Sequence, residues 1–152
     1  MREMAKAPFD KALIIRKMLE QGVIDKATLN RVLFLARSRD IDVLQVLINY
    51  SNMTPKQIQD FAAEQFNLPR LDLDDIVLNP EVAKLVPLDL ALAHRLIPAF
   101  KIINHTHLAV SNPFDVDGIN SVMKYLGEKS DIFLVTEEQV VRTIRDLSPD
   151  IL

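Results

Sequence analysis

Apolar and polar positions in the first 66 residues follow the period of amphipathic helices, in two similar copies about thirty positions apart. The copies are residues 18–33 and 47–62. Each predicts the end of an apolar helix, a tight turn with a polar capping residue, Asp25 or Thr54, and then a longer amphipathic helix. Such a unit buries its apolar face only against a neighbour. The repeat therefore predicts two stacked helix pairs, an arrangement more typical of a small docking module than of an active site.

Four helices are predicted from this pattern, and together they form a helical subdomain of residues 11–68. The first helix covers about residues 11–21, and the second runs from its cap at Asp25 to about Arg37. A third helix is predicted to begin at Asp40. The fourth has Thr54 as its cap and Pro55 at its first position, and it ends near Phe66. Residues 1–10 carry little pattern and are expected to be a flexible N-terminus.

Beyond residue 69 the pattern changes to short alternating runs, which predict a small α/β subdomain over residues 70–147. A short strand is expected at Leu71–Leu73, followed by two brief helices at Pro80 and Pro87. Residues 95–103 and 106–110 form a predicted hairpin with its turn at Asn104 and His105. Pro98 favours an edge position for the first of these strands.

The segment that follows the hairpin predicts one crossover unit. Asp115 and Asp117 are expected to form a turn and helix cap before an amphipathic helix that ends near Gly127, and residues 131–135 read as a buried strand. A strand, a helix and a strand in this order form a right-handed unit with parallel strands. Thr136 then caps a final helix. The predicted fold class is mixed α+β: two stacked helix pairs, then a small α/β subdomain with a hairpin and one βαβ crossover.

Composition excludes several classes of protein. The 152 residues are 49% hydrophobic, which suffices for a globular core, and the net charge of −3 is spread without a long run of lysine and arginine. Nucleic acid is therefore not expected as a partner. The absence of cysteine excludes disulfides and thiol chemistry. No apolar run approaches the roughly 20 residues that cross a bilayer, so membrane contact is expected only through a partner protein.

Motifs of catalysis are absent from the sequence. It contains no GxxxxGK[ST] phosphate loop, no nucleophile elbow and no HExxH. His105 and His107, with His94 as a possible third ligand, are the candidates for a metal site. Two histidines at a hairpin tip are more typical of solvent-facing turn residues. We assign no catalytic residue, no metal and no cofactor to this chain.

Two sets of charged residues have both a functional and a structural interpretation. Asp72, Asp74 and Asp75 resemble a cation site or paired carboxylates, but the EF-hand spacing and its terminal Glu are missing. The favoured interpretation is structural: Asp74 and Asp75 solvate a loop and cap the segment that follows. A second set makes the N-terminal half locally basic, as either a charged docking face or a solvated helix face would be. This set comprises Arg16, Lys17, Arg31, Arg37 and Arg39.

The order of four short passages resembles the N-terminal domain of the type II secretion ATPases, related to pilus-assembly ATPases and to cyclic-di-GMP-binding domains. The passages are DFAAEQFNLP at 60–69, LDL at 71–73, Pro87 ahead of AHRLIP at 93–98, and LAVSNPFD at 108–115. The resemblance covers about residues 13–147. It implies a cytoplasmic, hexameric parent whose ATP- and Mg²⁺-binding domains lie beyond Leu152, with residues 148–152 beginning a linker. It also implies a partner, the cytoplasmic domain of an inner-membrane secretion protein, which recruits the ATPase to the membrane.

The same resemblance implies a competing function, because some relatives bind cyclic di-GMP through two copies of a motif that opens with Arg-Leu-Gly, has a central Gly and ends in Gln. Laid on this chain, the opening triplets fall on residues 13–15 and 42–44, and neither has the Arg or the first Gly. The central position is Gly22 in one copy and Ser51 in the other, and the last is Ala36 or Gln65. Without arginines to pair with phosphate, this site is expected to be very weak.

The leading hypothesis is therefore a non-enzymatic docking and regulatory domain. We place its partner contact on the first helix, with the residues Leu13, Ile14, Arg16, Lys17 and Glu20. A cyclic-di-GMP sensor is the first alternative. An unrecognised small enzyme with a polar pocket near His94, His105 or residues 72–75 is the second.

Overall fold

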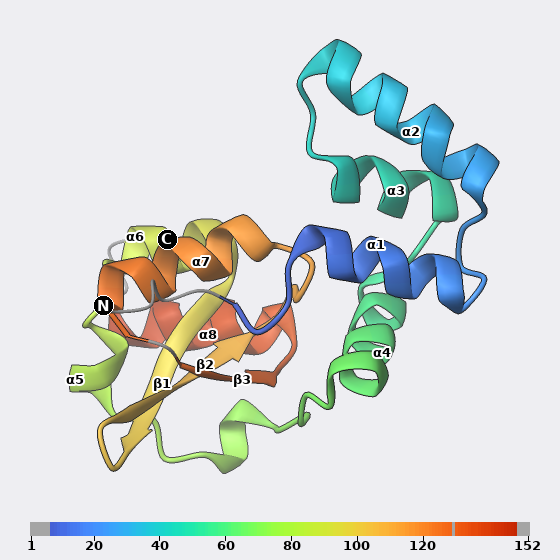
Figure 1. Ribbon diagram of the computed structural model, residues 1–152. Helices are drawn as coiled ribbons and strands as arrows, with labels where there is room; N and C mark the ends of the chain where they lie inside the picture. The colour runs from blue at the N-terminus through green and yellow to red at the C-terminus, as the bar shows by residue number, and fades with distance from the viewer. Residues whose placement is uncertain (1–6, 129, 149–152) are drawn as a thin grey trace, which may run out of the picture.

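The computed structural model describes residues 7–128 and 130–148, and these form a helical half and an α/β half that lie side by side (Figure 1). The helical half contains α1 (Lys11–Glu20), α2 (Lys26–Arg39), α3 (Val43–Ser51) and α4 (Pro55–Phe66). None of the helices within these described residues is long and apolar enough to cross a membrane. The predicted mixed α+β class is confirmed.

Helix caps set the boundaries of the four helices. The side chains of Asp10, Asp25 and Thr54 accept backbone N–H bonds at the starts of α1, α2 and α4, as the pattern predicts for the last two. The predicted start of the third helix at Asp40 is wrong. Asp40 has φ of +52° and ends α2, whereas the Asp42 side chain caps α3. The left-handed conformation at Asp40 turns the chain back, so the next helix begins only after it.

The two repeats meet through α2 and α3, which pack against each other at the end of the molecule farthest from the sheet (Figure 1). Val32 and Ala36 of α2, with Leu44 and Leu47 of α3, are buried. Lys11 at the start of α1 binds the carboxylate of Asp42, the cap of α3, at 3.1 Å, so the two helix starts lie side by side. Each pair thus buries its apolar side against the other, as the repeat predicts.

The α/β half is built on a three-stranded sheet in the order β1 (Leu96–Ile102), β2 (His105–Val110) and β3 (Asp131–Leu134). β1 and β2 are antiparallel, and β2 and β3 are parallel, joined by α7 (Val116–Leu126). This confirms the predicted crossover and the edge position of the strand that contains Pro98. The turn lies at Ile103 and Asn104, both with positive φ, one residue earlier than predicted.

The predicted strand at residues 71–73 is wrong. Leu73–Asp75 is the single 3₁₀ turn η1, because the Asp72 side chain accepts the backbone N–H of Asp74 and caps it. Only Arg70 makes a parallel bridge, to Leu134. The remaining helices are α5 (Pro80–Ala83), α6 (Leu88–His94) and α8 (Glu137–Leu147), and the predicted proline starts and Thr136 cap are confirmed.

Alternating residues divide the core between the two faces of the sheet. Leu96, Leu108 and Ile132 point to the face covered by α7, whereas their neighbours Ile97, Ala109 and Phe133 pack with α6 and α8. The first of these clusters continues into the helical half through Phe61 and Met18. The two halves therefore share one apolar core across the predicted boundary at residues 68–70.

Candidate functional site

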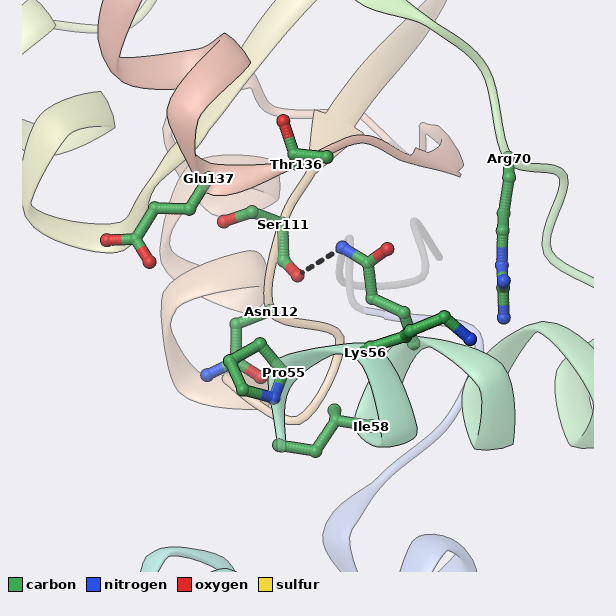
Figure 2. Close-up of a pocket in the computed structure, with 9 residues that line it drawn as sticks. Pro55, Lys56, Ile58, Arg70, Ser111, Asn112, Thr136 and Glu137 are labelled. Carbon is green, nitrogen blue, oxygen red and sulfur yellow. Dashed lines mark hydrogen bonds between the residues drawn. The ribbon is translucent and has the colours of Figure 1, made fainter. Parts of the chain in front are cut away.

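A cavity of about 490 Å³ lies where the start of α4 faces the carboxyl ends of β2 and β3 (Figure 2). Ser111 directly follows β2, and Thr136 caps α8 just after β3. The carboxyl ends of parallel strands are the usual place for ligands in α/β proteins. The lining consists of Pro55, Lys56, Ile58, Gln59, Arg70, Ser111, Asn112, Thr136 and Glu137.

Gln59 spans this cavity and connects α4 to both parallel strands. Its Nε2 donates to the carbonyl oxygen of Ser111 at 2.8 Å and to that of Val135 at 2.6 Å. Figure 2 shows the first of these bonds. The carbonyls of Ser111 and Val135 lie just past the ends of their strands, where the ladder of backbone hydrogen bonds stops. The side-chain amide of Gln59 supplies a donor to each of them. Gln59 thereby fixes the helical half against the sheet.

Two cations at the rim of the cavity share one carboxylate. Lys56 and Arg70 lie 3.1 and 2.5 Å from the two oxygens of Asp60. The hydrogen bond from Lys56 is the main reason that the pKa of Asp60 lies below its usual value, and the hydrogen bond from Arg70 is the second. The lining thus supplies amide, hydroxyl and charged groups for binding, but no nucleophile beside a base.

The residues predicted to bind a partner occupy different sides of α1. Arg16 and Glu20 are exposed, and Leu13 and Lys17 are half-buried. Ile14 is fully buried in the core, and its selection as a docking residue does not fit this position. The helical pattern marked it as apolar, but only the packing shows that the core covers its side chain.

One position aligned with the cyclic-di-GMP motif, Asp42, belongs to an ion cluster with Lys11 and Asp117. Asp42, in place of the second opening Arg, caps α3 and accepts a bond from Lys11 at 3.1 Å. Lys11 also binds Asp117 of α7 at 2.7 Å, and this bond is the main reason that the pKa of Lys11 is raised. The two carboxylates would repel a phosphate, and both already form ion pairs with Lys11, the nearby cation.

The other motif positions serve packing and turns. Gly22 follows α1 with φ of +71° and no neighbour within 4 Å of an added Cβ. Ser51 ends α3, and its hydroxyl donates to the carbonyl of Leu47. Ala36 is buried, and Gln65 is half-buried in α4. The scaffold of the motif is present without its charged groups.

The three histidines lie beside carboxylates rather than in one group. His105 and His107 lie on β2 with Nε2 and Nδ1 at 3.2 and 3.9 Å from Asp131, whereas His94 pairs with Asp115 at 2.8 Å. Over residues 7–128 and 130–148, no three His, Cys, Asp or Glu side chains are placed to hold a metal ion. Each histidine instead has a carboxylate partner.

Two members of the acidic loop have structural partners. Asp72 caps η1 and also accepts a bond from Gln139 of α8 at 2.6 Å. Asp74 binds Arg142 of the same helix at 3.0 Å. These contacts hold the loop against α8, which agrees with the capping interpretation.

Sequence reasoning missed the cavity and Gln59. The signal available was indirect: Ser111 and Thr136 each follow a predicted buried strand, and parallel strands bring such positions to one edge. The sequence carried no sign that Gln59, 52 residues before Ser111, reaches the same edge.

The fold of this chain is similar to that of solved N-terminal domains and related structures. It is similar to the structure of MshE with cdg (cyclic di-GMP), with 20% identity, a TM-score of 0.64, and coverage of 88% of this chain and 97% of that chain. It is also similar to the N-terminal domain of XpsE, with 17% identity, a TM-score of 0.57, and coverage of 92% of this chain and 97% of that chain. A second crystal form of that domain gives 15% identity and a TM-score of 0.58, with coverage of 95% and 97%.

The family comparison rests on sequence. No curated protein matches the chain. The MshEN domain model matches residues 66–151, a range that begins at the last residue of α4 and contains the whole α/β half. The resemblance inferred from short passages is thereby confirmed in family and fold. This chain belongs to the MshEN domain family.

Proposed function

We propose that this chain is the N-terminal docking and regulatory domain of a cytoplasmic secretion ATPase, and that it binds the cytoplasmic domain of an inner-membrane type II secretion protein. In this proposal ATP and Mg²⁺ belong to the catalytic domains of a hexameric parent. The domain itself carries no catalysis. It is peripheral to the membrane only through its partner.

The observation that carries the proposal is the charge of the segment that contains α1 and α2. Residues 11–39 contain seven lysines and arginines and only two acidic residues, although the whole chain has a net charge of −3. Arg16, Arg31, Arg37 and Arg39 are exposed, and none forms an ion pair with a described residue. A basic surface without internal partners favours association with an acidic protein surface.

Cyclic-di-GMP sensing is the second candidate. The observation in its favour is the similarity to MshE, whose structure is described with cdg. The ion cluster of Lys11, Asp42 and Asp117 weighs against it, because the carboxylate of Asp42 stands where the second copy of the motif needs a guanidinium. We therefore expect binding of the dinucleotide to be very weak.

Calorimetric titration tests the two candidates together. The chain is titrated with the cytoplasmic domain of the membrane protein and, in parallel, with cyclic di-GMP. We expect saturable binding of the protein and little heat from the dinucleotide. Binding of the dinucleotide alone would reject the docking proposal in favour of the sensor.

A pair of charge reversals tests the predicted contact on α1. Arg16→Glu changes an exposed residue of α1, and Lys124→Glu makes the same change in charge on exposed α7. If α1 forms part of the contact, only Arg16→Glu weakens binding. Equal affinity for both variants would place the contact elsewhere without rejecting the docking function.

A further inference from the structure

The outer side of α2 exposes a large apolar residue that is not part of the core. Val32 and Ala36 are buried against the core, whereas Phe34, on the other side of the helix, is 71% exposed. A solvated helix needs one apolar stripe, and an exposed aromatic side chain outside that stripe is of a type enriched in interaction surfaces.

Phe34 lies in a shallow groove and is flanked by arginines. The groove has a volume of about 480 Å³ and is lined by Asn30, Leu33, Phe34, Arg37 and Ser38. Arg31 and Arg37 stand one helical turn before and after Phe34, and both are exposed. We call Arg31, Leu33, Phe34 and Arg37 the α2 face. Figure 1 shows α2 at the end of the molecule farthest from the sheet.

The charges of the α2 face specify the chemistry of its partner. Neither Arg31 nor Arg37 is within 4.0 Å of a carboxylate among the described residues. Arginine next to an exposed aromatic side chain is the composition typical of the energetic centre of protein interfaces. An acidic surface with an apolar side chain complements both features. Nucleic acid fits less well, because the face has only two arginines around a phenylalanine and no stripe that tracks a backbone.

We propose that the α2 face, rather than α1, is the docking surface, and that it binds an acidic surface of the membrane protein that inserts an apolar side chain beside Phe34. This inference rests on the proposed function and assigns its contact. Phe34 supplies the apolar contact at the centre. Arg31 and Arg37 accelerate encounter and orient the acidic partner.

The test compares variants of the chain in titrations with the same cytoplasmic domain. Phe34→Ala and the double variant Arg31→Glu/Arg37→Glu alter the α2 face. Tyr125→Ala and Lys124→Glu/Arg145→Glu make matched changes on α7 and α8, where Tyr125 is 59% exposed. Phe34→Leu is a conservative variant. All these side chains are exposed, so circular dichroism and unfolding temperatures are expected to match those of the unaltered chain.

The expected result is a loss of affinity of about tenfold or more for both α2 variants, with the controls within about twofold. Phe34→Leu should retain most of the affinity. The affinity of the unaltered chain should fall as salt rises from about 0.05 to 0.5 M, and that of the arginine double variant should fall less.

The contrary outcomes separate the inference from the proposed function. If the partner binds and the α2 variants bind equally well, the inference is wrong and the docking function stands. Failure of the unaltered chain to bind rejects both. Sedimentation provides a further check: a dimer that Phe34→Ala dissociates would assign the α2 face to a second copy of the chain and overturn the partner named here.

Discussion

At the scale of residues, the first turn of α7 depends on the absence of a side chain at Gly118. Asp115 caps this helix with one oxygen, which accepts the N–H of Gly118 at 3.0 Å, and its other oxygen lies 2.8 Å from Nδ1 of His94. A Cβ on Gly118 would meet that oxygen at 2.3 Å and that nitrogen at 2.4 Å. The pair joins α6 to α7, so the glycine allows this contact.

Gly118→Ala is therefore expected to destabilise the chain by about 1–3 kcal/mol, because the added methyl forces the pair apart. Urea denaturation measures this, with Ser121→Ala on the exposed side of α7 as a control within about 0.5 kcal/mol. In a His94→Ala background the cost should be smaller. An equal cost in both backgrounds would show that the His94 contact is not the cause.

The carboxyl of Asp60 predicts a pH dependence of stability. Its pKa in the fold is lowered from 3.8 by Lys56 and Arg70. A lowered pKa contributes stability above the unfolded value, and this contribution is lost as pH falls through the folded value. Asp60→Asn should therefore lower the unfolding temperature at pH 7, and the difference from the unaltered chain should shrink as pH falls below 3.8 and vanish once pH is below the lowered pKa of Asp60.

Thermal unfolding between about pH 7 and pH 2.5 measures this difference. Glu64→Gln is the control, because Glu64 is exposed on the same helix and forms no ion pair with a described residue. A difference between Asp60→Asn and the unaltered chain that persists at the lowest pH would contradict the electrostatic explanation.

At the scale of elements, the hairpin of β1 and β2 closes with an unfavourable residue. Ile103 and Asn104 have φ of +48° and +61°, which two-residue hairpin turns of type I′ require. Asparagine adopts this conformation readily, but a β-branched isoleucine is strained in it. Ile103 is also 95% exposed, so its side chain gains little from packing.

Ile103→Asn is therefore expected to stabilise the chain by about 0.5–1 kcal/mol, in the range found when a turn residue is matched to its conformation. Urea denaturation measures the gain. Lys101→Asn, on the adjoining strand, should give no such gain, because asparagine is unfavourable in extended structure. Loss of stability in Ile103→Asn would show that Ile103 makes contacts that its exposure hides.

At the scale of the whole molecule, the helical half and the sheet are held by one core and a few long-range polar contacts. Phe61 of α4 meets Phe114 edge to face with ring centroids 5.8 Å apart, and Gln59 lies two residues earlier in the same helix. The amide of Gln59 binds the carbonyls at the ends of both parallel strands. This contact belongs to neither half alone.

Gln59→Met keeps the size of the side chain and removes both hydrogen bonds. We expect a loss of about 1–3 kcal/mol in the free energy of unfolding, because two partly buried carbonyls lose their donor. Gln45→Met is the control, since the side chain of exposed Gln45 in α3 bonds, among residues 7–128 and 130–148, only to Asn49, its neighbour one turn later. If Gln59→Met and Gln45→Met lower the free energy of unfolding by the same small amount, water replaces the amide of Gln59 at the cavity.

The sequence by itself determined the local structure of this protein. Helix caps at Asp25, Thr54 and Thr136, the edge position of Pro98 and the parallel crossover all depend on neighbouring residues or on fixed chain handedness, so the pattern predicts them. Errors arose where two local signals competed. Asp40 and Asp42 are both of a residue type that caps helices, and Asp42 is the one that caps α3. The alternation at residues 71–73 predicts a strand, but the cap made by Asp72 starts a 3₁₀ turn there instead.

Only the tertiary structure decided the surfaces and the site. Periodicity shows that Ile14 and Phe34 are apolar, but packing buries the first and leaves the second exposed. The cavity joins α4 to two strand ends more than 50 residues away, and the cluster of Lys11, Asp42 and Asp117 joins three helices. Such contacts depend on how distant segments pack in space, and no local pattern in the chain records that arrangement.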